Sequence, residues 1–337
     1  QHQGWVSFLS GDHDRSERRL RAAVATFEEL GDRDGRSWSL GLLAYVHHFG
    51  RRNDEALELA AEVLADARRW GDEWGAAMML NLQAAIWLWR DDVGRARSLA
   101  ERALGAFRRI DDRFGTIQVL GTISRASAAL GRVADVERTV EEVLALSDSF
   151  GELAYPSLAA AGAALHVGNG PRAVEHATNA IARLDTTGAN IDEGRVALAF
   201  GHLLGGDTDV ALATLLDVDV ESSPFALAAR ATAAVLVGDP SAALADVRAV
   251  EAMVASDVEV SYWDRSIAAI AGVAAATGDE AVRRAAEVRA LVRDVEDVIV
   301  VNYAADVLHR LGHDCETPVR TVVIGGWADV ADRITQC

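Results

Sequence analysis

The sequence contains no lysine, and all 33 of the residues counted as Lys or Arg are arginine. Without lysine the chain cannot form a Walker-type phosphate loop, a catalytic Schiff base or a Ser-Lys dyad. The formal net charge of −18 at pH 7 opposes contact with a phosphate backbone, so we expect no nucleic-acid binding through this chain. A GC-rich genome also produces arginine in place of lysine, so the absence is not by itself a functional signal.

Cysteine, proline and long apolar runs are scarce as well. The two cysteines, Cys315 and Cys337, are too few for a disulfide framework and fit a reducing compartment. Five prolines in 337 residues leave long stretches free to be helical. No run approaches the roughly 20 apolar residues that span a bilayer, and no basic-then-apolar leader is present. We therefore expect a cytoplasmic protein without membrane contact. We also expect it to be part of a longer polypeptide, because it begins with Gln1 and apolar residues follow at once.

What the sequence does contain is an internal repeat. A glycine or aspartate followed by an acid recurs every 40 residues after a bulky apolar residue, at Gly31-Asp32, Gly71-Asp72, Asp111-Asp112 and Gly151-Glu152. A second series of turns lies about halfway between them, at residues 11, 50, 91, 131, 168, 206, 238, 278 and 312. Glycine ends helices because it enters the left-handed region without a Cβ clash, and a following acid caps the next helix.

The segments between these turns have helical periodicity. Apolar residues at spacings of three and four form a stripe in one unit and again in the next: Ala56, Leu59, Ala60, Val63, Leu64 and Ala67, then Ala96, Leu99, Ala100, Ala103, Leu104 and Phe107. Such a stripe is buried only when neighbouring hairpins stack. The sequence therefore predicts an all-α superhelix of about nine helical hairpins in a single domain, 1–337. A possible weak seam lies near 217–224, and the hairpin after Pro318 is the least regular.

The spacing of small residues around the turns resembles the tetratricopeptide (TPR) pattern. Leu82, Asp91, Ala96, Ala100 and Ala103 fit it, although the period exceeds the usual length of about 34 residues and valine replaces the aromatic residue after the turn. The phrase that begins Leu30-Gly31-Asp32 also resembles the helical C-terminal regions of bacterial STAND-type ATPase regulators, of the MalT/LuxR, antibiotic-regulator and cyclase-linked types. The resemblance implies a TPR-like solenoid that serves as a sensor or scaffold arm. It implies no nucleotide or DNA binding, because those segments are absent from this chain.

Several motifs have both a chemical and a structural interpretation. The segment Gly168-Asn169-Gly170-Pro171-Arg172-Ala173 matches a dinucleotide fingerprint, but it follows a predicted helix instead of a strand and lies in register with the turns. His309, His313 and Cys315 have side chains that suit zinc. However, Gly312 should end their helix and no fourth ligand is evident beyond Asp314, so a chance group at an exposed turn is the alternative.

The remaining polar pairs are also explained without catalysis. His47 and His48 point in different directions on a helix and have no ligand partner one turn away. The acid pairs Asp91-Asp92 and Asp111-Asp112 lie in the turn register, where capping and the helix dipole favour acids. We therefore expect no catalytic residue, no metal site and no cofactor.

The better functional signal lies on the first helix of each hairpin, which lines the concave groove in TPR-like superhelices. After alignment on the turns, the predicted groove residues are His48, Asn81, Trp89, Gln118, Arg125, Tyr155, Arg195 and His202. Aromatic and arginine side chains carry most interface energy, although packing between hairpins is the favoured alternative for Trp89 and Tyr155. A tryptophan cluster consists of Trp38, Trp70, Trp74 and Trp87. Where these side chains are exposed, this end becomes the favoured docking surface.

Three functional hypotheses remain. The first is a non-catalytic scaffold or sensor arm of a bacterial regulator that binds a protein or peptide in its concave groove. The second is sensing of a small-molecule effector, which requires a deep pocket in place of an open groove. The third is an enzyme, which requires His, Asp and Ser or Cys clustered in one cleft, and no motif in the sequence points to such a cluster.

Overall fold

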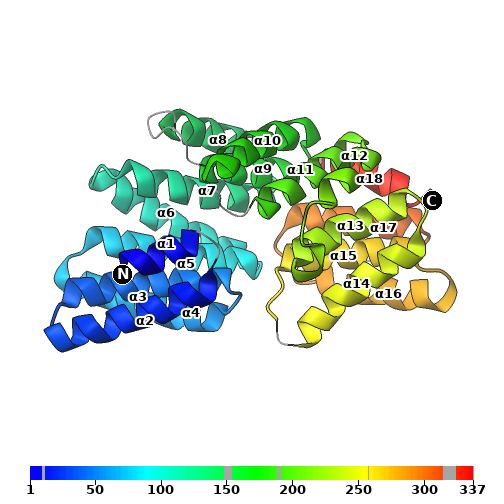
Figure 1. Ribbon diagram of the computed structural model, residues 1–337. Helices are drawn as coiled ribbons and strands as arrows, with labels where there is room; N and C mark the ends of the chain where they lie inside the picture. Colours follow the sequence, from blue (N-terminus) through cyan, green and yellow to red (C-terminus); the bar gives the residue numbers. More distant parts are fainter. Residues whose placement is uncertain (10–11, 148–153, 188–190, 257, 314–323, 337) are drawn as a thin grey trace.

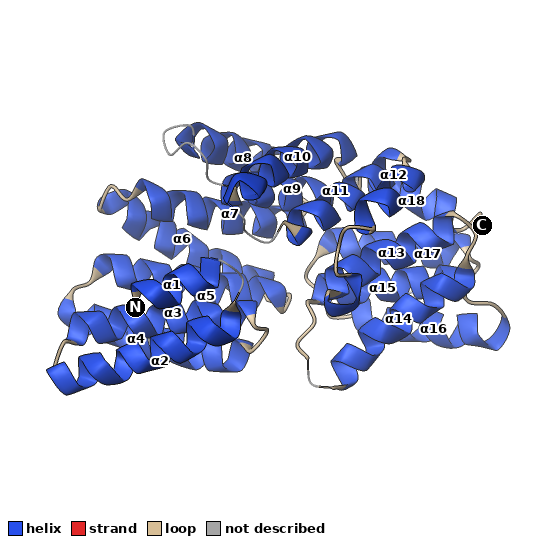
Figure 2. Ribbon diagram, viewed as in Figure 1, coloured by secondary structure: helices blue, strands red, loops and turns tan. Residues whose placement is uncertain are grey.

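The computed structural model describes residues 1–9, 12–147, 154–187, 191–256, 258–313 and 324–336. Within these ranges the regular elements are 18 α-helices and one short 3-10 helix, and no strand occurs (Figure 2). No helix of the described residues is both long and apolar enough to cross a membrane. The prediction of an all-α superhelix is confirmed.

The helices alternate between the first and second members of nine pairs. The first members are α1 (His2–Leu9), α3 (Arg33–Phe49), α5 (Glu73–Trp89), α7 (Arg113–Ala129), α9 (Tyr155–His166), α11 (Asp192–Gly205), α13 (Pro224–Leu236), α15 (Tyr262–Ala275) and α17 (Val298–Arg310). The second members are α2 (His13–Leu30), α4 (Asn53–Trp70), α6 (Val93–Arg109), α8 (Val133–Ser147), α10 (Gly170–Thr187), α12 (Thr208–Leu215), α14 (Pro240–Ala255), α16 (Gly278–Val292) and α18 (Gly326–Ile334). The 3-10 helix η1 (Val220–Ser222) lies between α12 and α13.

The turns form as the glycine-acid pairs predict. Gly31 has a φ of 67°, and its N–H donates to the Glu28 carbonyl oxygen, which ends α2. The Asp32 carboxylate then accepts a hydrogen bond of 3.0 Å from the Gly35 N–H and caps α3. Gly71 and Asp72 repeat this arrangement between α4 and α5. Each pair therefore ends one helix and starts the next.

Burial of the apolar stripes explains why the helices stack. On α4 the residues Ala56, Ala60, Val63 and Ala67 are fully or almost fully buried, whereas Leu59 is half-buried. Consecutive helices pack together along the described chain, and the first helices of successive hairpins also touch one another. Each stripe is therefore covered both by its own hairpin and by the next, as expected of a solenoid.

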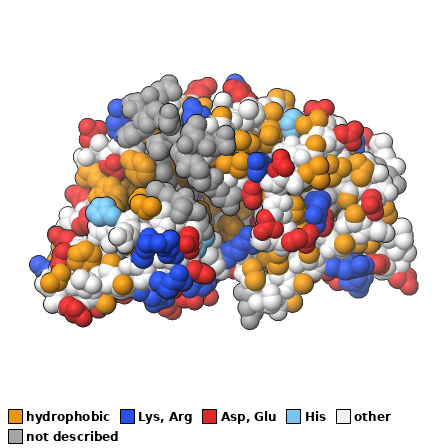
Figure 3. Space-filling model, in the orientation of Figure 1, with side chains coloured by type: hydrophobic (Ala, Val, Ile, Leu, Met, Phe, Trp, Pro, Cys, Tyr) orange, Lys and Arg blue, Asp and Glu red, His pale blue; other side chains and the backbone are white. Residues whose placement is uncertain are grey.

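The stacked hairpins curve into an arch with two arms (Figure 1). Helices α1–α5 form one arm, α7–α11 cross the top, and α13–α17 form the other arm. Helix α17 also touches α7, so the second arm packs against the helices that cross the top. The space-filling view shows a notch between the arms at the lower edge of the molecule (Figure 3).

The last helix departs from strict neighbour stacking. Helix α18 packs against α11, α13 and α17, and the buried Trp327 donates its indole N–H to the Leu165 carbonyl oxygen at 2.9 Å. Gly326 donates to the Gly168 carbonyl oxygen, and a Cβ on Gly168 would lie only 2.3 Å from the Ile324 carbonyl oxygen. Backbone contact this close requires glycine at position 168.

The hydrophobic core is continuous from α9 to α18. Val220 in η1 is buried and belongs to this core, so apolar contacts extend through the segment 217–224. The single domain of 1–337 and the weaker seam at that segment stay predictions.

Candidate binding face and its two ends

Half-exposed residues recur on one face of the first helices. On α5 they include Trp74, Met78 and Trp89, whose spacing of four and eleven residues places them on one face. On α9 the half-exposed residues Tyr155, Leu158, Gly162 and His166 follow the same pattern. This face ends in an exposed aromatic pocket in one direction and at the meeting point of the two arms in the other.

Three of the predicted groove residues hold neighbouring hairpins together. Asn81 is buried, and its side-chain oxygen accepts a hydrogen bond of 3.0 Å from the Thr122 hydroxyl between α5 and α7. The Tyr155 hydroxyl donates to the Gln118 backbone carbonyl oxygen at 3.1 Å between α9 and α7. The polar atoms of Asn81 and Tyr155 are thus already used within the fold, whereas the half-exposed Gln118 side chain is available.

His48 and Trp89 lie together at the ends of α3 and α5. Their rings meet edge-on with centroids 6.1 Å apart. The His48 Nδ1 is hydrogen-bonded to the Asn53 side-chain oxygen at 2.6 Å, whereas the buried Trp89 indole N–H has no hydrogen-bond partner in the described part of the chain. Burial lowers the pKa of His48, and the nearby Arg125 charge lowers it further, which favours the neutral imidazole at pH 7.

Arg125 is the exposed cation of this face. No hydrogen bond or ion pair joins it to any residue within the described ranges. Its charge acts on Tyr155 of α9 and on Tyr262 and Asp264 of α15, so it faces the space between the arms.

Arg195 and His202 form a separate group on α11. Arg195 donates to the Asp217 carbonyl oxygen at 2.9 Å and lies 3.5 Å from the Asp192 carboxylate. His202 Nδ1 lies 3.8 Å from the Asp207 carboxylate, beyond hydrogen-bonding distance. The structure therefore brings His48, Trp89 and Arg125 toward the meeting point of the arms, whereas Arg195 and His202 interact within their own part of α11 and α12.

The closed end consists of carboxylates that reach from one arm to the turns of the other. Glu259 accepts hydrogen bonds from the Arg90 guanidinium at 2.7 Å and from the Asn53 N–H at 3.3 Å. Glu296 accepts a hydrogen bond of 2.8 Å from the Gly94 N–H. These contacts join the α3–α4 and α5–α6 turns to segments that follow about 170 to 200 residues later, so they close the arch.

Asp91 completes this contact, and its burial disfavours the charged form of its carboxyl group. Its carboxylate accepts hydrogen bonds from the backbone N–H groups of Glu296 at 2.6 Å and Asp297 at 3.1 Å. Burial raises its pKa to about 7, and the neighbouring Asp297 charge adds to the effect, against the opposing influence of the two hydrogen bonds. Asp91 also has a φ of 68°, a conformation that a residue with a Cβ adopts at a cost.

Asp297 is the buried centre of the closed end. One carboxylate oxygen accepts hydrogen bonds from the Ile299 and Val300 N–H groups and caps α17. The other contacts His166 Nε2 and the Tyr262 hydroxyl. Burial raises the Tyr262 pKa well above its ordinary value, and the Asp297 charge raises it further, so Tyr262 is a neutral donor at pH 7. Three helices, α9, α15 and α17, are therefore joined through one carboxylate.

The open end is a pocket of about 480 Å³ between α3, α4 and α5. Its aromatic walls are Trp38, Trp70, Trp74 and Tyr45. The Trp38 and Trp74 rings stack with centroids 4.7 Å apart, and the Trp74 indole N–H donates to the Asp112 carboxylate at 2.8 Å. Trp38 and Trp70 remain 42% and 41% exposed, so this is the exposed part of the predicted tryptophan cluster.

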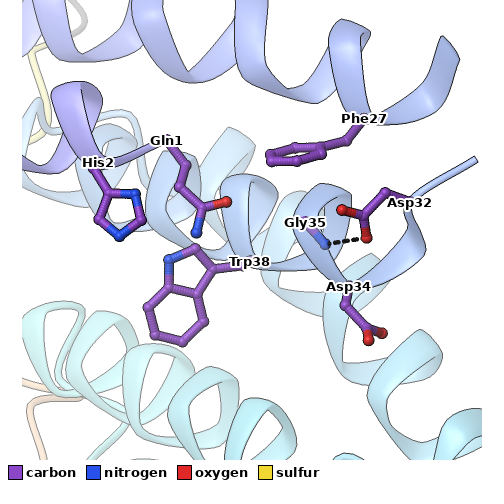
Figure 4. A pocket seen from close by; sticks show the side chains of 7 residues that line it. All are labelled: Gln1, His2, Phe27, Asp32, Asp34, Gly35 and Trp38. Carbon is purple, nitrogen blue, oxygen red and sulfur yellow. Dashed lines mark hydrogen bonds between the residues drawn. The ribbon is translucent and has the colours of Figure 1, made fainter. Parts of the chain in front are cut away.

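A second pocket, of about 630 Å³, lies on the other side of Trp38. Figure 4 shows Phe27 and Trp38 on opposite walls, with His2 at one end and the carboxylates of Asp32 and Asp34 at the other. The fourth predicted tryptophan, Trp87, lies away from both pockets, where Arg95 stacks over its ring at 3.6 Å from the centroid.

Within each acid pair the two residues have different roles, which the capping interpretation did not predict. Asp92 and Asp112 cap α6 and α7 as expected, by accepting from the N–H groups of Arg95 and Gly115. The first acid of each pair instead has a positive φ, and Asp91 binds the opposite arm. Capping is therefore the wrong explanation for Asp91. The available signal was an aspartate in the place where most repeats have glycine.

The glycine-rich segment that begins at Gly168 forms a turn and the start of a helix. Gly168 lies in the turn between α9 and α10, Gly170 is the first residue of α10, and the Asn169 side chain accepts from the Arg172 N–H. His309 is exposed and His313 half-buried, whereas Cys315 lies outside the described residues. Within the described ranges no group of three or more His, Cys, Asp or Glu side chains is arranged to hold a metal ion.

The comparisons with known proteins concern both the sequence and the fold. No family model matches the chain, and no curated protein matches it. A similar solved structure is the crystal structure of a tetratricopeptide repeat protein from Parabacteroides merdae, at 14% sequence identity and a TM-score of 0.47. The match covers 79% of this chain and 96% of the other.

Proposed function

We propose that this chain is a non-catalytic scaffold or sensor arm that binds a protein or peptide segment along its concave face. The observation that carries the proposal is that one cationic and one aromatic side chain of the first helices, Arg125 and Trp38, stay exposed. Arg125 is exposed without an ion-pair partner among the described residues, and Trp38 keeps 42% of its surface in solvent. Arginine and tryptophan are the residue types that dominate binding energy at interfaces.

Site-specific photocrosslinking tests this function. A photoreactive phenylalanine analogue at Gln118, on the concave side of α7, should give a discrete protein adduct in lysate from the source organism, and excess unlabelled chain should compete with it. The same group at Arg102, exposed on α6, is the control and should give no such adduct. Absence of an adduct from position 118, or equal adducts from both positions, would count against a concave binding face. Arg125→Glu should weaken the adduct without changing the fold.

We propose further that the arm belongs to a larger bacterial regulator. This part of the proposal is supported by the resemblance of the Gly31-Asp32 type of turn to those regulators. Sequencing the open reading frame on both sides of the chain tests it directly. A nucleotide-binding domain encoded upstream is the expected result, and an unrelated enzyme domain would contradict it.

A small-molecule effector is the second candidate. The pocket beside Trp38 has a volume of about 480 Å³, within the roughly 300–1,000 Å³ typical of ligand sites. A thermal-shift screen of metabolites should then stabilise the wild type and not Trp38→Ala. No stabilisation by any compound would leave the peptide as the preferred ligand.

A further inference from the structure

The pocket between α3, α4 and α5 has a rigid aromatic floor. Trp74 is held by its hydrogen bond to Asp112, the residue that caps α7, and Trp38 stacks on Trp74. Tyr45 is tied to the Met78 backbone carbonyl oxygen. Side chains fixed in this way lose little conformational entropy when a ligand binds, which favours affinity. The floor is therefore prepared for contact with a large apolar group.

The charged side chains that line the pocket are acidic. The formally charged side chains that line this pocket and its neighbour are Asp32, Asp34 and Asp72. Asp32 and Asp72 are occupied as helix caps. Asp34 is exposed in the first turn of α3 and has no ion-pair partner within the described ranges. A free carboxylate beside exposed indole rings is complementary to a cation that carries an apolar stem.

The same surface already shows this chemistry within the chain. The Arg33 guanidinium lies 5.1 Å from the centre of the Trp70 ring. Arginine thus stacks on one of the pocket's own indoles, although Arg33 is not a wall of the pocket. An incoming arginine or lysine could stack on Trp38 in a similar way and pair with Asp34.

We propose that this pocket binds a protein segment in which a large apolar side chain stands next to an arginine or lysine. The apolar side chain lies against Trp38 and Trp74, and the cation pairs with Asp34. This proposal rests on the proposed function and narrows it, because it names the end of the concave face that contacts the partner and the chemistry of the partner segment.

Selection from a random decapeptide library displayed on phage tests the proposal with the full chain immobilised. Enriched peptides should share an aromatic or large aliphatic residue adjacent to arginine or lysine. A synthetic copy of the strongest peptide should bind Trp38→Ala at least about tenfold more weakly, the effect of losing an aromatic hot spot. Asp34→Asn should weaken binding about two- to fivefold and reduce its dependence on salt, as expected for one exposed ion pair.

Asp279→Asn is the matched control. Asp279 is also an exposed acid in the first helical turn, but it lies on α16 in the other arm, so the substitution should leave peptide affinity unchanged. Circular dichroism of each variant confirms that the helices are intact. Enrichment of acidic peptides would overturn the proposal. Binding of the peptide to Trp38→Ala and Asp34→Asn as tightly as to the wild type would overturn it as well.

The same experiment separates this proposal from the function on which it rests. Peptides whose binding is lost in Arg125→Glu and retained in Trp38→Ala would overturn the pocket and support the concave face. A library that yields no peptide above the background of the Trp38→Ala, Arg125→Glu double variant would overturn both.

Discussion

The two ends of the concave face consist of different kinds of side chain. At the open end, tryptophan rings stack on one another and remain partly in solvent beside an unpaired carboxylate. At the closed end, carboxylates from both arms bind backbone N–H groups, an arginine, a histidine and a tyrosine. Polar groups that are buried must be paired inside the fold, and the closed end meets that requirement with long-range contacts. The side chains of the open end are partly exposed to solvent, so they need no partner within the fold and are available to bind another molecule.

This difference predicts that substitutions at the closed end affect stability and those at the open end affect binding. Among substitutions at the closed end, Asp297→Ala should have the largest effect, because it removes the cap of α17 and leaves His166 and Tyr262 without their common acceptor. We expect a loss of about 3 kcal/mol in the free energy of unfolding, measured by urea denaturation. Asp239→Ala removes an exposed cap from α14 and should cost only about 1 kcal/mol. Equal losses for the two variants would remove the distinction between a buried link and an ordinary cap.

The pH dependence of the closed end should come next in size. Burial raises the pKa of Asp91 to about 7 in the folded state, above the value of about 4 expected in the unfolded chain. The folded state therefore binds more protons between these values, and stability should fall as pH rises from about 4 through 7. Asp264, raised to about 6 by burial, acts in the same direction at lower pH. Asp91→Asn should flatten the fall between pH 6 and 8 in thermal melts, whereas Asp264→Asn should act mainly below pH 6 and change that interval much less. A profile for Asp91→Asn identical to the wild type would show that this carboxylate does not titrate at the contact.

At the open end, Trp38→Ala should change stability only slightly. The side chain is 42% exposed and its main fixed contact is the stack on Trp74, so we expect a loss of about 1 kcal/mol. Trp327→Ala is the comparison, because that side chain is 1% exposed and hydrogen-bonded, and its loss should cost about 3–5 kcal/mol. Urea denaturation of both variants gives the two values. If Trp38→Ala proved as costly as Trp327→Ala, Trp38 would be a structural residue and its place in a binding pocket would need another explanation.

Local rules account for the parts of the fold that the sequence predicts well. The Gly31-Asp32 and Gly71-Asp72 turns depend on residues within four positions of one another, and so does the apolar stripe of α4. The stack of Trp38 on Trp74 does not follow from this register, because Trp38 lies six residues after Asp32 and Trp74 only two residues after Asp72. The contact of Asp91 with Asp297 has no local cause. It spans 206 residues and depends on the curvature that accumulates from small rotations between hairpins, which no single repeat specifies. Asn81 shows the same limit on a smaller scale, because its burial depends on how closely α5 and α7 approach.

The smallest predicted effect concerns the Arg90–Glu259 pair, which joins the arms at 2.7 Å with both side chains about one-quarter exposed. A double-mutant cycle with Arg90→Ala and Glu259→Ala should give a coupling of about 0.5–1 kcal/mol, since the pair is only partly shielded from water. The i,i+4 pair Arg97–Glu101 lies within one helix and should give about 0.3–0.5 kcal/mol. The two pairs should differ most in an Asp91→Ala background. There the coupling between Arg90 and Glu259 should decrease, because the segments that carry Glu259 and Glu296 are held less closely to the α5–α6 turn. The coupling between Arg97 and Glu101 within α6 should persist. A cross-arm coupling that is unaffected by Asp91→Ala would mean that each contact forms independently and that the closed end is not a cooperative unit.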